Sequence, residues 1–263
     1  MTIASESDLY AALATSQDLR CFKNTITAVA GRLMSLWRAT GQPEQGAIPG
    51  AAAVCTKATG GSNSFSNAGV GKTLYLLNVG GAINSAATTL TIMDRLVASG
   101  NLSGVVATAQ TVNTPALTRR TDGVRNRIFL EWYTATGATP VTVTASYTNQ
   151  DGTAGKTTGT VSLPATVIAG SMFELPLAAD DSGVQSVQTV TLSATTGTAG
   201  AFGVTIAAVL ATTPMPIANQ GYNYDAQSLG LPVIENNACL QYAITALSTA
   251  TGACQAVVRI GAN

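Results

Sequence analysis

Alternating apolar and polar residues mark the middle of the chain as β-structure. Over residues 141–147 valine, alanine and tyrosine alternate with threonine and serine, which is the period of two of a half-buried strand. The flanking segments 127–134 and 156–163 are also typical of strands, and Asp151 with Gly152 supplies a tight turn before the last of them. The pattern predicts a three-stranded antiparallel meander over residues 127–163.

A different period occupies residues 16–40. Large apolar residues recur there every three or four positions, which is the spacing of one helix face. Thr15 and Ser16 are suitable N-terminal caps, and Gly41 and Pro43 would end the helix. The helix would form a short coiled-coil seam or lie on the β-domain, and in either case its apolar face is a candidate anchoring or oligomerisation surface. The residues of this predicted interface are Leu19, Phe22, Ile26, Val29, Leu33 and Trp37.

These patterns predict a mainly β fold, an antiparallel, jelly-roll-like β-sandwich with an N-terminal α-helix and an extended arm. The expected organisation is a helical arm (1–45), a Gly/Ala/Ser-rich linker (46–71), the sandwich (72–215), and a C-terminal loop with a closing hairpin that packs on the sandwich (216–263). Gly80 and Gly81 are expected to form a turn. Residues 94–104 are expected to form a loop, and residues 238–247 and 253–260 are expected to form the hairpin.

The charge content is low and balanced. The 263 residues include 13 Lys and Arg and 13 Asp and Glu, so charged residues make up 10 % of the chain against about 25 % in an ordinary soluble domain. This composition favours a chain that packs against neighbours over a solitary enzyme. It also argues against nucleic acid as a partner, and the basic pair Arg119 and Arg120 is interpreted as a solvated loop or a subunit contact. No apolar run is long enough to span a membrane and the N-terminus lacks a signal peptide, so use or assembly in the cytoplasm is expected.

Candidate chemistry is sparse. The chain has no histidine, which excludes Ser-His and Cys-His nucleophiles and imidazole metal sites. Its cysteines match no zinc spacing and are expected to be buried free thiols, with a disulfide formed after cell lysis as the alternative; they are Cys21, Cys55, Cys239 and Cys254.

Acidic residues are the remaining candidates for a site. Asp180 and Asp181 fit a structural turn better than a catalytic or calcium-binding pair, because adjacent residues of a turn point apart. Glu131 is interpreted as the outward charge of a strand, with a carbohydrate-binding groove as the alternative.

GVGKT at residues 69–73 fails as a phosphate loop, because Ser66 replaces its first glycine and a strand follows. We therefore predict no catalytic residue, no metal and no cofactor.

Three segments resemble virion structural proteins of tailed bacteriophages. They are TIMDRLVASGNLSGVVATAQTVNTPAL (91–117), ASYTNQDGTAGKT (145–157) and LAADDSGVQSVQTVTLS (177–193). Members of that type carry a similar DRL…SG loop, YTN..GTAG turn and D-S/T-G-V-Q-S-V strand. The similarity covers roughly half of the chain, within residues 74–210, and does not include the N-terminal segment.

The resemblance implies a non-enzymatic subunit of the virion. A decoration or cement protein that binds the major capsid protein or other virion subunits fits best, as a homo-oligomer (trimer or dimer) assembled in the host bacterial cytoplasm. A neck or tail component has the same sequence style. A carbohydrate-binding, receptor-binding sandwich is the alternative of another class, with Trp132, Tyr133, Tyr222 and Tyr224 as the candidate stacking platforms.

Overall fold

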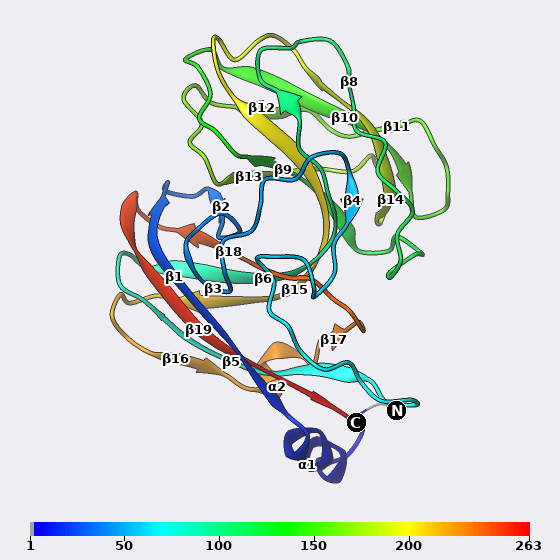
Figure 1. The fold of residues 1–263 in the computed structure, drawn as a ribbon, viewed down its shortest axis with the longest axis vertical. Coiled ribbons are helices and arrows are strands. Elements are labelled where there is room, and N and C mark those ends of the chain that lie inside the picture. Colours follow the sequence, from blue (N-terminus) through cyan, green and yellow to red (C-terminus); the bar gives the residue numbers. More distant parts are fainter. Residues whose placement is uncertain (1–2) are drawn as a thin grey trace.

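The computed structural model describes residues 3–263 and confirms a mainly β, antiparallel fold with a short N-terminal helix. Figure 1 shows three layers along the long axis of the molecule, with the N-terminal helix at one end. The middle layer is a closed ring of strands, and a separate sheet packs on each side of it. We call these the central barrel, the terminal sheet, which contains the first and last long strands, and the distal sheet.

The terminal sheet joins the two ends of the chain. Its first and last long strands pair along almost their whole length, from Gln17 opposite Ile260 to Ala28 opposite Ala250. The strands, in spatial order, are β16 (Tyr222–Tyr224), β5 (Leu74–Ile83), β19 (Ala250–Ala262), β1 (Gln17–Ala28) and β3 (Gly41–Gln42), with β17 (Val233–Ile234) also pairing with β5.

The central barrel is closed by one extra pairing. Six strands follow one another around the ring, and the first and the last also pair with each other, from Thr88 opposite Met215 to Ala98 opposite Thr205. Closure leaves no free edge within the ring. The six are β6 (Thr88–Ala98), β18 (Leu240–Ala246), β2 (Leu33–Ser35), β13 (Ser171–Leu175), β9 (Asn126–Trp132) and β15 (Ala201–Met215), with β4 (Ala53–Val54) added to β6 and β7 (Leu102–Ser103) added to β15.

The distal sheet contains two of the three segments whose sequence resembles phage virion proteins, and part of the third. Residues 145–157 and 177–193 pair with each other there, from Ala145 opposite Val190 to Asn149 opposite Val184, and part of residues 91–117 forms the next strand. Two bulges interrupt that pairing. The strands are β11 (Lys156–Thr157), β10 (Val141–Asn149), β14 (Val184–Leu192) and β8 (Gln110–Thr111), with β12 (Val161–Leu163) also on β10.

Hydrophobic side chains fill the spaces between the layers. One cluster joins the terminal sheet to the barrel through β1, β5 and β19 on one side and β6 and β18 on the other. A second cluster joins the barrel to the distal sheet and includes Trp132 and Phe202, whose ring centroids lie 4.6 Å apart. The aromatic residues of the predicted meander are therefore core residues, with Trp132 0 % and Tyr133 6 % exposed.

The helix predicted over residues 16–40 is wrong. Residues 17–28 form β1, in which Leu19, Cys21 and Lys23 point inward while Phe22 points outward. The inward Lys23 hid this alternation in the sequence. Its ammonium group is buried and donates hydrogen bonds to backbone oxygens, including that of Pro43 at 2.7 Å. The predicted helical arm is thus an integral part of the terminal sheet.

The N-terminal helix lies earlier in the chain. α1 (Glu6–Ala14) is capped by Ser5, whose hydroxyl accepts a hydrogen bond from the Asp8 N–H, while the Asp8 carboxylate accepts one from the Ser5 N–H. Ala12 packs on Tyr75 of β5. A Cβ atom on Gly261 would lie 2.2 Å from the Ala12 carbonyl oxygen, so only glycine allows this close approach. A second helix, α2 (Ala226–Leu229), follows β16.

Two predicted strand pairings are also wrong. β18 and β19 lie in different layers, since β18 pairs with β2 and β6 whereas β19 pairs with β1 and β5. Similarly, β9 belongs to the barrel, and only β10, β11 and β12 of the predicted meander pair with one another. In both cases consecutive strands separate because each finds a buried position against another layer.

Candidate functional site

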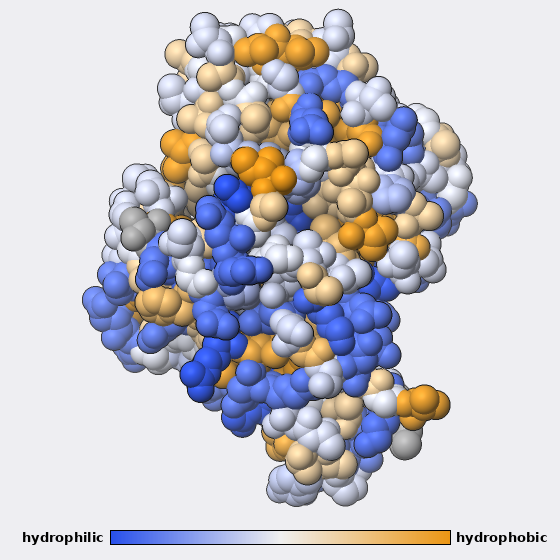
Figure 2. All heavy atoms as spheres, viewed as in Figure 1, coloured by the Kyte–Doolittle hydropathy of each residue, from blue (hydrophilic) through white to orange (hydrophobic). Residues whose placement is uncertain are grey.

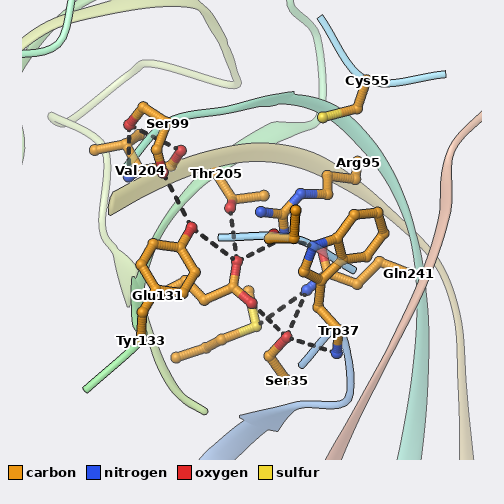
Figure 3. Close-up of polar contacts among 12 residues, drawn as sticks. Ser35, Trp37, Cys55, Arg95, Ser99, Glu131, Tyr133, Val204, Thr205 and Gln241 are labelled. Atoms are coloured by element: carbon orange, nitrogen blue, oxygen red, sulfur yellow. Dashed lines mark hydrogen bonds and ion pairs between the residues drawn. The ribbon is translucent and has the colours of Figure 1, made fainter. Parts of the chain in front are cut away.

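A polar cluster fills one end of the barrel interior (Figure 3). The Arg95 guanidinium lies 2.6 Å from the Glu131 carboxylate, and both side chains are almost fully buried. Glu131 also accepts hydrogen bonds from the Ser35 hydroxyl and, at 3.2 Å, from the Thr205 hydroxyl. Arg95 donates a further hydrogen bond to Gln241 Oε1 at 2.9 Å. The prediction that Glu131 is an outward charge or lines a carbohydrate groove is therefore wrong.

The cluster has the properties of a structural element that stabilises one arrangement of the barrel strands. Burial lowers the pKa of Arg95, but the adjacent Glu131 carboxylate together with Tyr133 and Cys55 outweighs burial and raises the pKa, so the guanidinium stays charged. The ring of Trp37 covers Arg95, with 4.5 Å between its centroid and Cζ. Because five of the six barrel strands contribute a side chain to the network around Glu131, the cluster holds the barrel in one register.

A second buried ion pair lies beside the first. Arg119 donates to both carboxylate oxygens of Asp94, at 2.7 and 2.9 Å, and its other amino group donates to the Cys55 carbonyl oxygen at 2.7 Å. Arg119 is 7 % exposed, so its interpretation as a solvated loop or subunit contact is wrong. The predicted loop over residues 94–104 is also wrong, because β6 continues to Ala98 and carries Asp94 and Arg95 into the interior.

The six residues of the predicted interface do not share a surface. Leu19 and Ile26 lie in the core under the terminal sheet, and Trp37 lies over Arg95. Val29 is half-buried just after β1, and Leu33 lines one mouth of the barrel. Phe22 is the exception among them, because it is 44 % exposed on the outer face of the terminal sheet.

Phe22 borders a groove across the terminal sheet, which we call the Phe22 groove. Gly80 and Ala82, the outward positions of β5 there, lie beside Val257 and Gln255 of β19. Because Gly80 and Ala82 are small, they leave a hollow of about 530 Å³. It is bounded on one side by the outer side chains of β1 and β19, and on the other side by those of β16. The hollow continues into a second one of about 230 Å³. Its lining residues include Arg20, Phe22, Asn78, Gly80, Ala82, Tyr222, Asn223, Gln255 and Val257.

The groove was not predicted from the sequence. Gly80 and Gly81 were expected to form a turn, but both lie inside β5, opposite Val257 and Ala256. The sequence signal was present, because glycine within a strand often marks a close approach or a missing side chain. Phe22 and Val257 are 44 % and 41 % exposed, so the groove presents apolar side chains beside amide groups.

The outer face of the distal sheet is lined by hydroxyl groups, and we call it the hydroxyl face. Along β10, buried apolar residues alternate with half-buried serine and threonine, and on the bulged β14 the half-buried positions are Ser186, Thr189 and Thr191 together with Gln185 and Gln188. The register places Thr144 opposite Thr191, and Thr148 opposite Ser186. These outer positions carry no charge; they are Thr111, Thr142, Thr144, Ser146, Thr148, Thr157, Ser162, Ser186, Thr189 and Thr191.

The face of the molecule drawn in Figure 2 mixes polar and apolar residues, with hydrophilic residues gathered over its lower half. On the side of the molecule drawn in Figure 2, pale residues of near-neutral hydropathy cover much of the surface, and the orange hydrophobic ones form small separate patches. The Phe22 groove and the hydroxyl face belong to the two outer layers, at opposite ends of the long axis in Figure 1. Each would present an uncharged or weakly charged contact area to a neighbour.

The other predicted residues have structural roles. Asp181 lies in a turn, where its carboxylate accepts hydrogen bonds from the Tyr147 hydroxyl and from Asn149 Nδ2, at 2.7 Å for the latter. All four cysteines are buried and free, as predicted. Within residues 3–263, no group of three or more acidic or cysteine side chains is placed to hold a metal ion, and neither helix is long and apolar enough to cross a membrane.

Comparisons with known proteins identify no family. No protein-family model and no curated protein matches the sequence. Among solved structures, a chain from the structure of infectious bursal disease virus, Gx strain, is 12 % identical to this protein. The match covers 94 % of this protein and 80 % of the viral chain, with a TM-score of 0.20. The VP2 subviral particle of infectious bursal disease virus is 10 % identical over 99 % of this chain and 83 % of that chain, also with a TM-score of 0.20. Superposition this weak supports no conclusion about the function of this chain.

Proposed function

We propose that this chain is a non-enzymatic structural protein of a tailed-phage virion, and specifically a capsid decoration or cement protein. It binds the major capsid protein or another virion subunit and stabilises the shell through subunit contacts. The Phe22 groove is the observation that carries this proposal, because an exposed aromatic residue beside a hollow is typical of the anchor of a protein interface. The sequence resemblance in the distal sheet and the barrel supports the phage assignment.

The rest of the molecule suits this role. The closed barrel, with its buried polar cluster, is a rigid body that positions two different outer faces. The hydroxyl face is uncharged, so a second copy could approach it without electrostatic repulsion, in keeping with a dimer or trimer. Many weak contacts of this kind act together on a particle with repeated sites.

Binding to particles tests the proposal. The double variant Phe22→Ser/Val257→Ser changes two outward side chains and leaves both cores intact, and Val209→Ser is the matched control, since Val209 is 46 % exposed at the barrel mouth. We expect the double variant to co-sediment with shells that lack this protein at least ten-fold more weakly than the wild type, and the control to bind normally. Equal binding of all three proteins would refute the groove as the contact. Images of decorated particles would show whether the copies lie on the shell, at the neck or along the tail.

Carbohydrate binding is the second candidate, and the groove also supplies its best observation. Tyr222 lines the groove together with the amide side chains of Asn78, Asn223 and Gln255, a combination that binds sugars through stacking and hydrogen bonds. Trp132 and Tyr133, by contrast, are buried and cannot stack on a ligand. Binding to a glycan array that Tyr222→Ala abolishes, together with normal shell binding by the groove double variant, would favour this function over the first.

A further inference from the structure

Cys55 and Cys239 meet end to end on one edge of β6. β15 pairs along the whole of one edge of β6, and β4 and β18 pair one after the other along the opposite edge of β6. The Cys55 N–H, just after β4, donates to the Leu96 carbonyl oxygen at 2.9 Å, and the Cys239 carbonyl oxygen, just before β18, accepts from the Arg95 N–H at 2.8 Å. Because Arg95 and Leu96 are consecutive, the two cysteines take successive positions along that edge.

This arrangement suits a disulfide. The two thiol groups lie within hydrogen-bonding contact of each other, so a disulfide between them needs only a small movement of the side chains. Both side chains belong to one small buried cluster, with Trp37 and Ala98, in which Cys55 is 4 % and Cys239 0 % exposed.

The remaining two cysteines are less well placed. Cys21 lies opposite Ala256, and Cys254 lies opposite Lys23, so they are diagonal neighbours on β1 and β19. Diagonal positions on paired strands are about 7–8 Å apart, which exceeds the usual span of a disulfide. They provide an internal control.

The two buried ion pairs hold the junction and activate one thiol. Arg119 donates to the Cys55 carbonyl oxygen, and the Asp94 carboxylate, which pairs with Arg119, accepts from the Cys239 N–H at 2.9 Å. Within the described residues, Nε and Nη2 of Arg95 are buried without a hydrogen-bond partner, and Figure 3 shows Cys55 on the Arg95 side of the cluster. The pKa of the Cys55 thiol is lowered by a hydrogen bond with Cys239 and by the charges of Arg95 and Arg119, which together outweigh its burial.

We propose that Cys55 and Cys239 are an oxidisable pair that closes to an intramolecular disulfide once the protein leaves a reducing compartment. The oxidant is a peroxide. The Cys55 thiolate attacks one peroxide oxygen, the O–O bond breaks, and the departing hydroxide takes up a proton to become water, which leaves Cys55 as a sulfenic acid. The Cys239 sulfur then attacks the Cys55 sulfur, the S–O bond breaks, the Cys239 thiol proton is lost, and a second water leaves. Two thiols are oxidised by two electrons and one hydrogen peroxide is reduced to two waters.

The bond would join the end of β4 to the start of β18. It closes a loop from residue 55 to residue 239 and therefore restricts the unfolded chain strongly. It also fixes the segment around β4, whose regular pairing with β6 consists of two residues, to the edge of the barrel. A subunit exposed to an oxidising medium outside the cell would gain stability from this closure.

Thiol counting on the full-length protein tests the proposal. Reduced protein is treated with a small excess of hydrogen peroxide, denatured, alkylated with N-ethylmaleimide and weighed. We expect four alkylated cysteines before oxidation and two after it, with Cys21 and Cys254 still alkylated and a linked peptide that contains Cys55 and Cys239. We also expect a rise in the melting temperature of roughly 5–15 °C that dithiothreitol reverses.

Variants separate this pair from other oxidation. Cys254→Ser should still form the link, whereas Cys239→Ser should leave Cys55 as a sulfenic acid that dimedone traps. Four alkylated thiols after peroxide treatment, a link between Cys21 and Cys254, or a link between two chains would each overturn the proposal. If the serine variants fold poorly, the linked peptide of the wild-type protein decides the question without them.

Discussion

Removing the carboxylate from the barrel interior should be strongly destabilising. Glu131→Leu leaves the buried Arg95 guanidinium without its counter-ion, and Gln241 Oε1 remains as an acceptor. The hydroxyl groups of Ser35 and Thr205 lose their acceptor as well. Breaking one side of a buried ion pair costs about 3–5 kcal/mol of the free energy of unfolding. At about 2–4 °C per kcal/mol for a chain of this size, the melting temperature should fall by roughly 6–20 °C.

A double variant and a control at an exposed ion pair distinguish the loss of charge from the loss of packing. Arg95→Met/Glu131→Leu removes both charges at similar volume, and its unfolding free energy should lie within about 1–2 kcal/mol of the wild type. Glu174→Leu is the matched control, because Glu174 pairs with Arg127 at 3.7 Å on the surface, with side chains 52 % and 39 % exposed. Its loss should cost less than about 1 kcal/mol.

Urea unfolding, followed by circular dichroism and by tryptophan fluorescence, measures these differences, and coincidence of the two signals checks that the transition is two-state. If Glu131→Leu lowers the unfolding free energy no more than Glu174→Leu does, Glu131 is not needed to compensate the buried charge of Arg95. If the double variant is as unstable as Glu131→Leu alone, the cost arises from packing rather than from the charge on Arg95.

Three further predictions follow from named contacts. Tyr147→Phe should lower the unfolding free energy by about 1–3 kcal/mol in urea titrations, because the Tyr147 hydroxyl donates to Asp181 and accepts from the Ala178 N–H. Hydrogen bonds from Asn149 and Tyr147 lower the pKa of Asp181. The contribution of this carboxylate to stability is therefore complete above about pH 3.9 and is lost as the pH falls through the lowered pKa. Asp181→Asn should reduce the acid dependence of the urea midpoint, and an unchanged dependence would contradict this prediction. Gly261→Ala should displace α1 and speed proteolysis before β1, whereas Gly69→Ala, which meets nothing within 4 Å, should not.

The predicted strands were mostly confirmed where one face of a sheet is buried and the other is polar. β10 is the clearest case, because its buried valine, alanine and tyrosine alternate strictly with threonine and serine. β1 was missed because Lys23 occupies an inward position, where backbone carbonyl oxygens bind its ammonium group. Local periodicity cannot reveal such a residue, since its partners come from residues 39–44, beyond the strand itself.

The sequence by itself determined the class of the fold and the absence of imidazole chemistry. Alternation along each strand selects β-structure locally, and a chain with no histidine cannot supply that group from anywhere. The tertiary structure alone decided which strands are neighbours, and with this the sites. β18 and β19 follow one another in the chain but lie in different layers, while β6 and β15 close a ring that places Arg95 against Glu131. Strand pairing depends on which hydrophobic faces bury one another across the whole molecule, and the Phe22 groove and the Cys55–Cys239 junction both arise from pairings of that long-range kind.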